Sequence, residues 1–303
     1  MWQIFSLCAV LSNTVEETVD KATMLGSSAL DSVAAAWIRN IIVFGIAIIV
    51  ALVLQQSFPP LLFSLPIIWW GLIYTVQAII YTWILKHVEI TAASVTFALL
   101  PLIFLPIDLY VRHEPITALQ IGGILLLVLG GIVFFARKDL TAKISIKRYV
   151  GMMLLVLVFD AIVFGSEGYI FKSYYDSVSI NPSTFLVSGM LYMCIFLSIA
   201  LLVKFAWFGG KLDFSGASAY VRGSSIAKIA DYGNTFFTLQ ALTIATVSQV
   251  MAMKVLHPLI LLGVTMVAQH KLSVELEEAF TRDTVIQKIS GIAFIVIGSF
   301  LIR

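Results

Sequence analysis

Ile41-Ile-Val-Phe-Gly-Ile-Ala-Ile-Ile-Val-Ala-Leu-Val-Leu54 contains no polar side chain, and Ile121 to Ala136 is a second run of the same kind. A strand of a membrane barrel alternates apolar and polar residues, whereas these runs are apolar on every side. A helix that is apolar all round lies in lipid or in a protein core. The two runs therefore predict an all-α membrane protein.

The composition extends this prediction to the whole chain. Of the 303 residues, 60% are hydrophobic and only 12% are charged, and the mean hydropathy is +1.01. A helix needs roughly 20 residues to cross a hydrocarbon core about 30 Å thick, so the chain is long enough for about ten transmembrane helices. We expect one integral-membrane domain.

Apolar runs between charged residues, prolines and glycines locate the expected helices. They lie near 2–24, 33–54, 66–86, 90–111 and 117–136, and then near 150–171, 183–206, 223–240, 244–268 and 287–302. A basic connector, residues 137–149, separates a first five-helix repeat (1–136) from a second (150–303). The first run continues into Glu16 and Glu17 without a cleavage site, which predicts a retained helix.

The two halves also match in sequence, as internal repeats do. An offset of 157 residues aligns polar and proline positions: Tyr74 with Asp231, Gln77 with Asn234, and Pro101 with Pro258. An offset of 151 aligns charged positions: Glu16 with Glu167 and Lys21 with Lys172. Because each half has an odd number of predicted crossings, the second half enters the membrane inverted, as in many secondary transporters.

The last helix of each half carries glycines at the same spacing. Gly123 and Gly130 lie seven residues apart, as do Gly291 and Gly298. Small residues at such spacing allow helix backbones to approach closely in a membrane. We expect both helices to pack tightly on a neighbour.

Three segments resemble a known family. They are Leu11-Ser-Asn-Thr-Val-Glu-Glu-Thr-Val-Asp-Lys21, Trp37-Ile-Arg39, and Glu114-Pro-Ile-Thr-Ala-Leu-Gln120-Ile-Gly122. The chain is similar to EamA-like members of the drug/metabolite transporter superfamily, which implies a ten-helix carrier. The second half lacks a Glu matching Glu114. The positive-inside rule places both termini outside, whereas the resemblance implies cytoplasmic termini.

Ionisable residues within predicted spans are the first candidates for a binding site, because a central charge costs about 2.5–3.5 kcal/mol on insertion scales. The spacing puts Asn13, Glu16 or Glu17, and Asp20 on one helical face. The alternative is a headgroup boundary with Glu17 paired to Lys21. Glu167 is a candidate because it recurs at the position of Glu16, although a structural salt bridge would recur as well.

Two further spans carry polar candidates that align with each other. Asp231 and Asn234 lie one turn apart, although Lys228 could simply neutralise Asp231. Tyr74 and Gln77 occupy the matching positions in the first half and would suit the wall of a binding site. Trp69 and Trp70 fit such a wall or an interfacial aromatic belt equally well.

Lys254 and His257 share a face just before Pro258, where the helix loses a backbone hydrogen bond. Lys254 lies inside an apolar run and is the best candidate for binding an anionic group. His257 is either proton-responsive or a hydrogen-bonded structural residue. Arg39 stands near the start of a span, where a basic side chain ordinarily extends to the interface.

The predicted function is a secondary transporter, an exporter or exchanger of a small polar metabolite such as an amino acid, working by alternating access. Proton coupling is left open, as is a homodimer. The substrate-binding candidates are Lys254, His257, Glu16, Glu167, Asp231, Asn234, Tyr74 and Gln77. The alternative is a non-transporting membrane subunit or sensor.

The remaining expectations concern other classes of function. The sequence has no HExxH, GxSxG or aspartate-rich motif, so we predict no enzyme, cofactor or metal. A net charge of +2 without a basic stripe predicts no nucleic-acid partner. The predicted partners are a small-molecule substrate and membrane lipid, and the predicted location is the cell (inner) membrane, with multiple passes.

Overall fold

The structure is a computed structural model that describes residues 1–25, 30–53, 64–87, 99–135, 146–207, 217–257, 259–261, 263–264 and 282–302. Every regular element among these residues is a helix, and they contain no strand. The predicted all-α class is confirmed for this part of the chain.

The first half contributes α1 (Trp2–Leu25), α2 (Ser32–Val53), α3 (Leu65–His87), a π-helical turn η2 (Ile107–Val111) and α5 (Ala118–Phe135). Residues 99–106 are helical and lead into η2. The second half contributes α6 (Ile146–Val178), α7 (Pro182–Trp207), α8 (Ala217–Leu242), α9 (Val247–Lys254) and α11 (Arg282–Leu301).

Four predicted spans differ from the observed helices. α8 begins at Ala217 instead of near 223, and α11 begins at Arg282 instead of near 287. α6 continues to Val178 instead of ending near 171, because a helix does not have to end where its sequence becomes polar. The predicted span 244–268 is interrupted by a turn at residues 255–256 in its described part. Thr246 and Gln249 form a capping box that starts α9 at Val247, and the backbone N–H of Val255 bonds back to Ala252, which ends it at Lys254.

Three helices in the described part of the chain are long and apolar enough to cross a membrane. These stretches are Ser32–Val50 in α2, Leu65–Thr82 in α3 and Pro182–Trp207 in α7. Shorter apolar helical stretches occur at Leu99–Val111, Ala118–Val133, Val247–Leu261 and Ser290–Leu301. The chain is therefore suited to a membrane, while ten crossings in two inverted halves remain a prediction.

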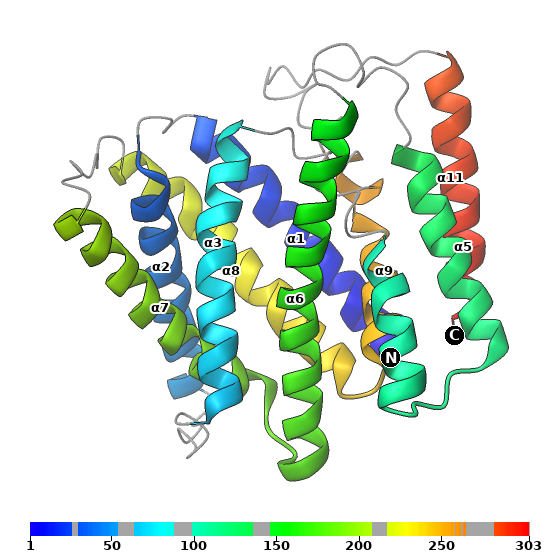
Figure 1. Ribbon diagram of the computed structural model, residues 1–303, viewed down its shortest axis with the longest axis horizontal. Helices are drawn as coiled ribbons and strands as arrows, with labels where there is room; N and C mark the ends of the chain where they lie inside the picture. Colours follow the sequence, from blue (N-terminus) through cyan, green and yellow to red (C-terminus); the bar gives the residue numbers. More distant parts are fainter. Residues whose placement is uncertain are drawn as a thin grey trace.

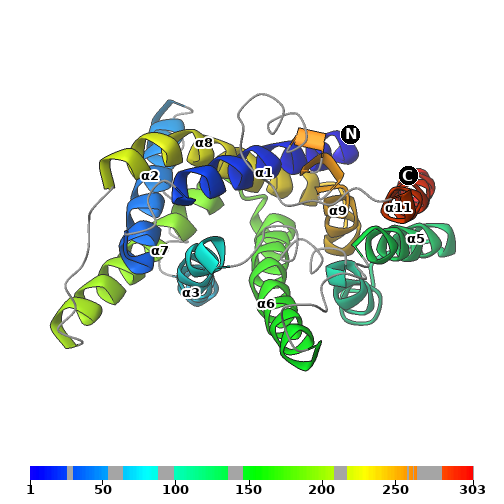
Figure 2. The same cartoon turned by 90° about the horizontal axis from the view of Figure 1, so that it is seen from above.

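The pair α1 and α8 forms one face of the molecule. The two helices run alongside each other, crossing the view of Figure 1 diagonally and lying along one edge of the view in Figure 2. On one side α7 packs against both α2 and α3, and α6 packs against α3. At the other edge α5 and α11 form a pair of their own (Figure 1).

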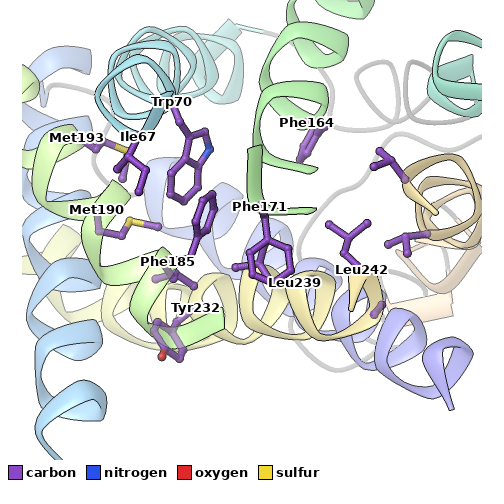
Figure 3. Packing of buried hydrophobic residues seen from close by; sticks show 14 of the residues in the cluster. Ile67, Trp70, Phe164, Phe171, Phe185, Met190, Met193, Tyr232, Leu239 and Leu242 are labelled. Atoms are coloured by element: carbon purple, nitrogen blue, oxygen red, sulfur yellow. The ribbon is translucent and has the colours of Figure 1, made fainter. Parts of the chain in front are cut away.

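The main hydrophobic cluster lies where α3, α6, α7 and α8 meet (Figure 3). Trp70 stacks on Phe185 with ring centroids 4.6 Å apart, and it meets Tyr74 edge-on at 5.4 Å. A Cβ atom at Gly189 would overlap the Trp70 ring. Glycine is therefore required for α3 to lie this close to α7.

The glycines of α5 and α11 pack against each other. A Cβ at Gly123 would lie 2.9 Å from the carbonyl oxygen of Gly298, and a Cβ at Gly130 would lie 2.8 Å from that of Gly291. These positions are the two glycine pairs that stand out in the sequence. Their predicted role in close helix packing is confirmed, and each helix is the other's partner.

Candidate functional site

Five charged side chains from α1, α2 and α8 form the central feature, here called the charge cluster: Glu16, Asp20, Arg39, Lys228 and Asp231. Lys228 Nζ lies 3.3 Å from an oxygen of each of the three carboxylates. Arg39 Nη2 pairs with Glu16, lies 3.2 Å from Asp20 and lies 3.6 Å from Asp231. Each carboxylate therefore contacts both cations.

The order of contacts shows how α1 and α8 position this cluster. Asn234 Nδ2 donates to Asn13 Oδ1 at 3.1 Å, while Glu16 and Asp20 meet Lys228, which lies earlier in α8. Advancing along α1 thus means going backward along α8, so the two helices are antiparallel. The predicted common face of Asn13, Glu16 and Asp20 is confirmed.

Glycines in α8 bring the two helices together at both ends of this polar stretch. A Cβ at Gly223 would overlap the Thr23 side chain, and one at Gly233 would lie 3.2 Å from the Ser12 hydroxyl oxygen. The short interhelical distance lets side chains of ordinary length form direct ion pairs. The helix packing therefore sets the geometry of the charge cluster.

Arg39 corrects the sequence interpretation. Its place near the start of a span predicts that it extends to the membrane interface, but it is only 7% exposed and its guanidinium lies 4.6 Å from the centre of the Tyr81 ring. Three carboxylates from other helices hold it inside. Sequence reasoning could not locate these partners because they come from α1 and α8.

The acids that the headgroup-boundary alternative concerns are not exposed at the surface of α1. Glu17 and Asp20 are buried within the protein instead of lying at an exposed edge. The side chain of Lys21, the partner that this alternative gives to Glu17, lies outside the described residues. The Lys228–Asp231 pair is confirmed at 3.3 Å, but Lys228 also donates to Glu16.

A second polar group joins α1 to the segment after α9. Glu17 Oε1 accepts a hydrogen bond from Asn13 Nδ2 at 3.2 Å, and Glu17 Oε2 lies 3.5 Å from His257 Nε2. Asn234 donates to Asn13 and so connects α8 to the same group. His257 and Asn234, both predicted as site residues, are therefore joined through Glu17 and Asn13, which are outside the predicted substrate-binding set.

A third group brings three predicted residues together. The Tyr74 hydroxyl donates to Glu167 Oε2 at 2.7 Å, joining α3 to α6. Lys254 of α9 lies 4.8 Å from the centre of the Phe164 ring, and it interacts electrostatically with Glu167. Gln77 is half-buried on α3, one turn beyond Tyr74.

Lys254 differs from the other buried cations in its surroundings. It is only 6% exposed. Among the described residues it has no hydrogen bond and no direct ion pair; its close contact is the Phe164 ring. Its charge is balanced only at longer range by Glu167, Glu16 and Asp231. An ammonium in this state can accept an anionic ligand without first giving up a partner.

A further polar group surrounds Glu114, which carried part of the family resemblance. Arg112 lies 3.3 Å from Glu114 and donates to Asp176 at 2.7 Å. Lys172 lies 3.6 Å from Glu114 and donates to the Ala245 carbonyl at 3.1 Å. These contacts connect the end of α6 to the segment after η2 and to the start of α9.

Comparison with known proteins establishes the fold alone. No family match and no curated protein match was found for the chain. A solved structure described as "Crystal structure of protein" matches with a TM-score of 0.69 at 15% identity, over 100% of this chain and 98% of that one. The chain therefore has a fold like that of an experimentally solved protein over its full length.

Proposed function

We propose that the protein is a secondary transporter of a small polar metabolite, working by alternating access in the cell (inner) membrane. It would resemble the EamA-like members of the drug/metabolite transporter superfamily. The observation that carries this proposal is the buried Lys254 ammonium, which has neither a hydrogen bond nor a direct ion pair among the described residues. A packing helix gains nothing from such a charge, whereas a solute site does.

The surroundings of Lys254 support a substrate that carries both signs of charge. The ammonium suits a carboxylate or another anionic group, and Glu167 with its Tyr74 partner provides a carboxylate on a neighbouring helix. Phe164 adds an aromatic ring beside the ammonium. An amino acid or a similar zwitterion has a matching pair of charges, so it heads the proposed substrate class.

The pairing of the helices supports two related halves. Exchanging the halves would exchange α1 with α6, α2 with α7, α3 with α8 and α5 with α11. Under this exchange the α2–α7 and α5–α11 contacts map onto themselves, and the α1–α8 contact maps onto the α3–α6 contact. All these contacts are present, as expected for an inverted-repeat carrier whose site lies between halves.

The test is ligand-induced stabilisation followed by transport. Purified protein is screened by thermal shift against a panel of amino acids and small carboxylates, and the best ligand is then assayed for uptake into proteoliposomes. We expect Lys254→Ala to abolish the thermal shift and reduce flux at least tenfold, because the anionic group loses the buried cation that is proposed to bind it. Lys204→Ala serves as the matched control, since Lys204 pairs with Asp31 at a helix end.

Two results would contradict the proposal. One is full flux in Lys254→Ala, which would remove this residue from the site. The other is a wild-type protein that binds a panel ligand but moves none of it across the vesicle membrane, which would favour a sensor.

A further inference from the structure

The charge cluster contains an unequal number of opposite charges. Glu16, Asp20 and Asp231 supply three carboxylates, whereas Arg39 and Lys228 supply two cations that each contact all three. Four of these side chains are nearly or completely buried, and the side chain of Asp231 is 19% exposed. With every group ionised the cluster would carry one uncompensated negative charge, which is costly away from water.

The groups that surround the cluster do not supply the missing positive charge. Lys254 acts on Glu16 and Asp231, but it is matched by Glu167. Glu17 adds a further carboxylate and faces His257. Tyr81 and Tyr220 contribute uncharged phenols near Arg39 and Asp20. Among the side chains that the structure describes, the surplus negative charge therefore persists when the neighbouring helices are included.

One oxygen of Asp20 points to the same conclusion. Both ion pairs of Asp20 go through Oδ2, Oδ1 takes part in no ion pair, and neither buried oxygen has a hydrogen-bond partner among the described residues. An ionised carboxylate is rarely left with a bare oxygen in a buried position, because the unmade hydrogen bonds cost free energy. A protonated carboxyl group carries no net charge, so its burial costs less free energy than burial of an ionised carboxylate.

A metal ion is the less suitable occupant. Within the described chain no group of three or more His, Cys, Asp or Glu side chains is arranged to hold a metal ion. The Glu16 and Asp231 oxygens that face the cluster already accept hydrogen bonds from Lys228. A proton, by contrast, needs one oxygen and no coordination shell.

We propose that Glu16, Asp20 and Asp231 together hold one exchangeable proton, so that the charge cluster is neutral and is a proton-binding site. Protonation forms one O–H bond on a carboxylate with a proton taken from water, and release returns it to water. Asp231, the most exposed member, is where the exchange takes place. A separation of α1 from α8 would remove Lys228 from Glu16 and Asp20, and so change their affinity for the proton. The role of this proton in coupling rests on the proposed transporter function.

Infrared spectroscopy tests the proton without any substrate. A protonated carboxyl group has a carbonyl stretch that an ionised carboxylate lacks, and deuterium exchange shifts it. We expect the band in wild-type protein at neutral pH and its loss in Glu16→Gln, Asp20→Asn and Asp231→Asn. Each variant leaves two carboxylates for two cations, so no proton is then required. Asp176→Asn is the matched control, because Asp176 is a half-exposed partner of Arg112.

The pH dependence of stability is a second test, and its first measurement uses wild-type protein alone. If the folded cluster holds a proton that the unfolded chain releases at neutral pH, stability must fall as the pH rises. For one proton the ratio of folded to unfolded protein changes about tenfold per pH unit. We expect the melting temperature of wild-type protein to fall between about pH 6 and about pH 8. The slope should be smaller in Asp20→Asn.

The outcomes separate this proposal from the transporter function. A carbonyl band that is absent from wild-type protein, or whose intensity is not reduced in any of the three cluster variants, would overturn the proton site. A melting temperature with the same pH slope in wild-type protein and Asp20→Asn would overturn it as well. Neither measurement uses transport, so failure of the flux assay leaves both results interpretable.

Discussion

Tyr74 illustrates how single polar contacts hold the buried site together. Its hydroxyl donates to the nearly fully buried carboxylate of Glu167, and its ring packs edge-on against Trp70. Removing a donor from a buried charged acceptor costs more than the net value of the hydrogen bond, because the acceptor is left unsatisfied. The Tyr74 hydroxyl is therefore expected to stabilise the folded protein in addition to the packing of its ring.

Tyr74→Phe keeps the ring and removes only this donor. We expect it to destabilise the protein by about 1–3 kcal/mol, measured as a fall in the midpoint of unfolding in detergent. Tyr110→Phe is the control, since Tyr110 is 77% exposed. Equal midpoints for Tyr74→Phe and wild-type protein would mean that another group satisfies Glu167.

At the scale of elements, helix packing in this protein depends on glycine at particular positions. Gly122 and Gly123 are adjacent in α5, but only Gly123 faces α11, with the Gly298 carbonyl 2.9 Å from the position of a Cβ. A Cβ at Gly122 would meet nothing within 4 Å. The neighbouring pair thus provides a test and its control on the same helix.

Gly123→Ala forces α5 and α11 apart, and we expect a loss of about 1–3 kcal/mol. Gly122→Ala should be neutral, or stabilising by up to about 1 kcal/mol, because alanine favours helix more than glycine does. Thermal unfolding of the two variants side by side is the measurement. A greater loss in Gly122→Ala than in Gly123→Ala would contradict the described packing.

The start of α2 is held by one side chain with two functions. Asp31 Oδ1 accepts from the backbone N–H of Val33 at 2.9 Å and of Ala34 at 3.3 Å, which caps the helix. Asp31 Oδ2 pairs with Lys204, near the end of α7. Burial alone would raise the pKa of Asp31, but the hydrogen bonds from Lys204 and from the two backbone groups outweigh it and lower the pKa.

A lowered pKa in the folded state fixes the sign of the pH effect. Asp31 stabilises the protein above its ordinary pKa of about 3.9, and this contribution is lost as the pH falls through the lowered value. Asp31→Asn keeps the cap and loses the charge, so its deficit in melting temperature should be present near neutral pH and disappear in acid. Asp31→Ala should cost about 1 kcal/mol through the lost cap alone. A deficit for Asp31→Asn that grows in acid would contradict this assignment.

At the scale of the whole molecule, most of the tight helix pairs join the two predicted halves. α1 packs on α8, α2 on α7, and α5 on α11, and the charge cluster combines residues of α1 and α2 with residues of α8. A first half on its own would leave Glu16 and Asp20 without Lys228, and a second half on its own would leave Lys228 with Asp231 as its one carboxylate of the cluster. Neither half is therefore expected to be stable alone.

Expressing the chain as two fragments, cut inside the basic connector 137–149, tests this dependence. We expect each fragment alone to aggregate or be degraded, and the two together to copurify through a tag on one of them. Introducing Arg39→Ala should weaken the copurification, because removing one partner of a buried ionic group costs about 3–5 kcal/mol. A first fragment that is stable and monodisperse by itself would show that the halves fold independently.

Much of the fold follows from the sequence because its determinants are local. The apolar runs predict α1, α2, α3, α5 and α7 to within a few residues, since each run reports the environment of its own helix. The glycine spacing predicts close packing for α5 and α11. The end of α6 and the break after Lys254 do not follow from the runs, because they depend on capping and on contacts with other segments.

The candidate site, like the fold, was predictable from the sequence only in part. The sequence by itself determined that acids and bases lie within apolar spans, that Asn13, Glu16 and Asp20 share a face, and that Lys228 can reach Asp231 along one helix. Only the tertiary structure decided that Arg39 is buried against three carboxylates, that His257 faces Glu17, and that Lys254 has no hydrogen bond or ion pair in the described chain. The physical reason is range: helical periodicity fixes neighbours within a turn, whereas ion pairs between helices depend on how closely and in which direction the helices pack.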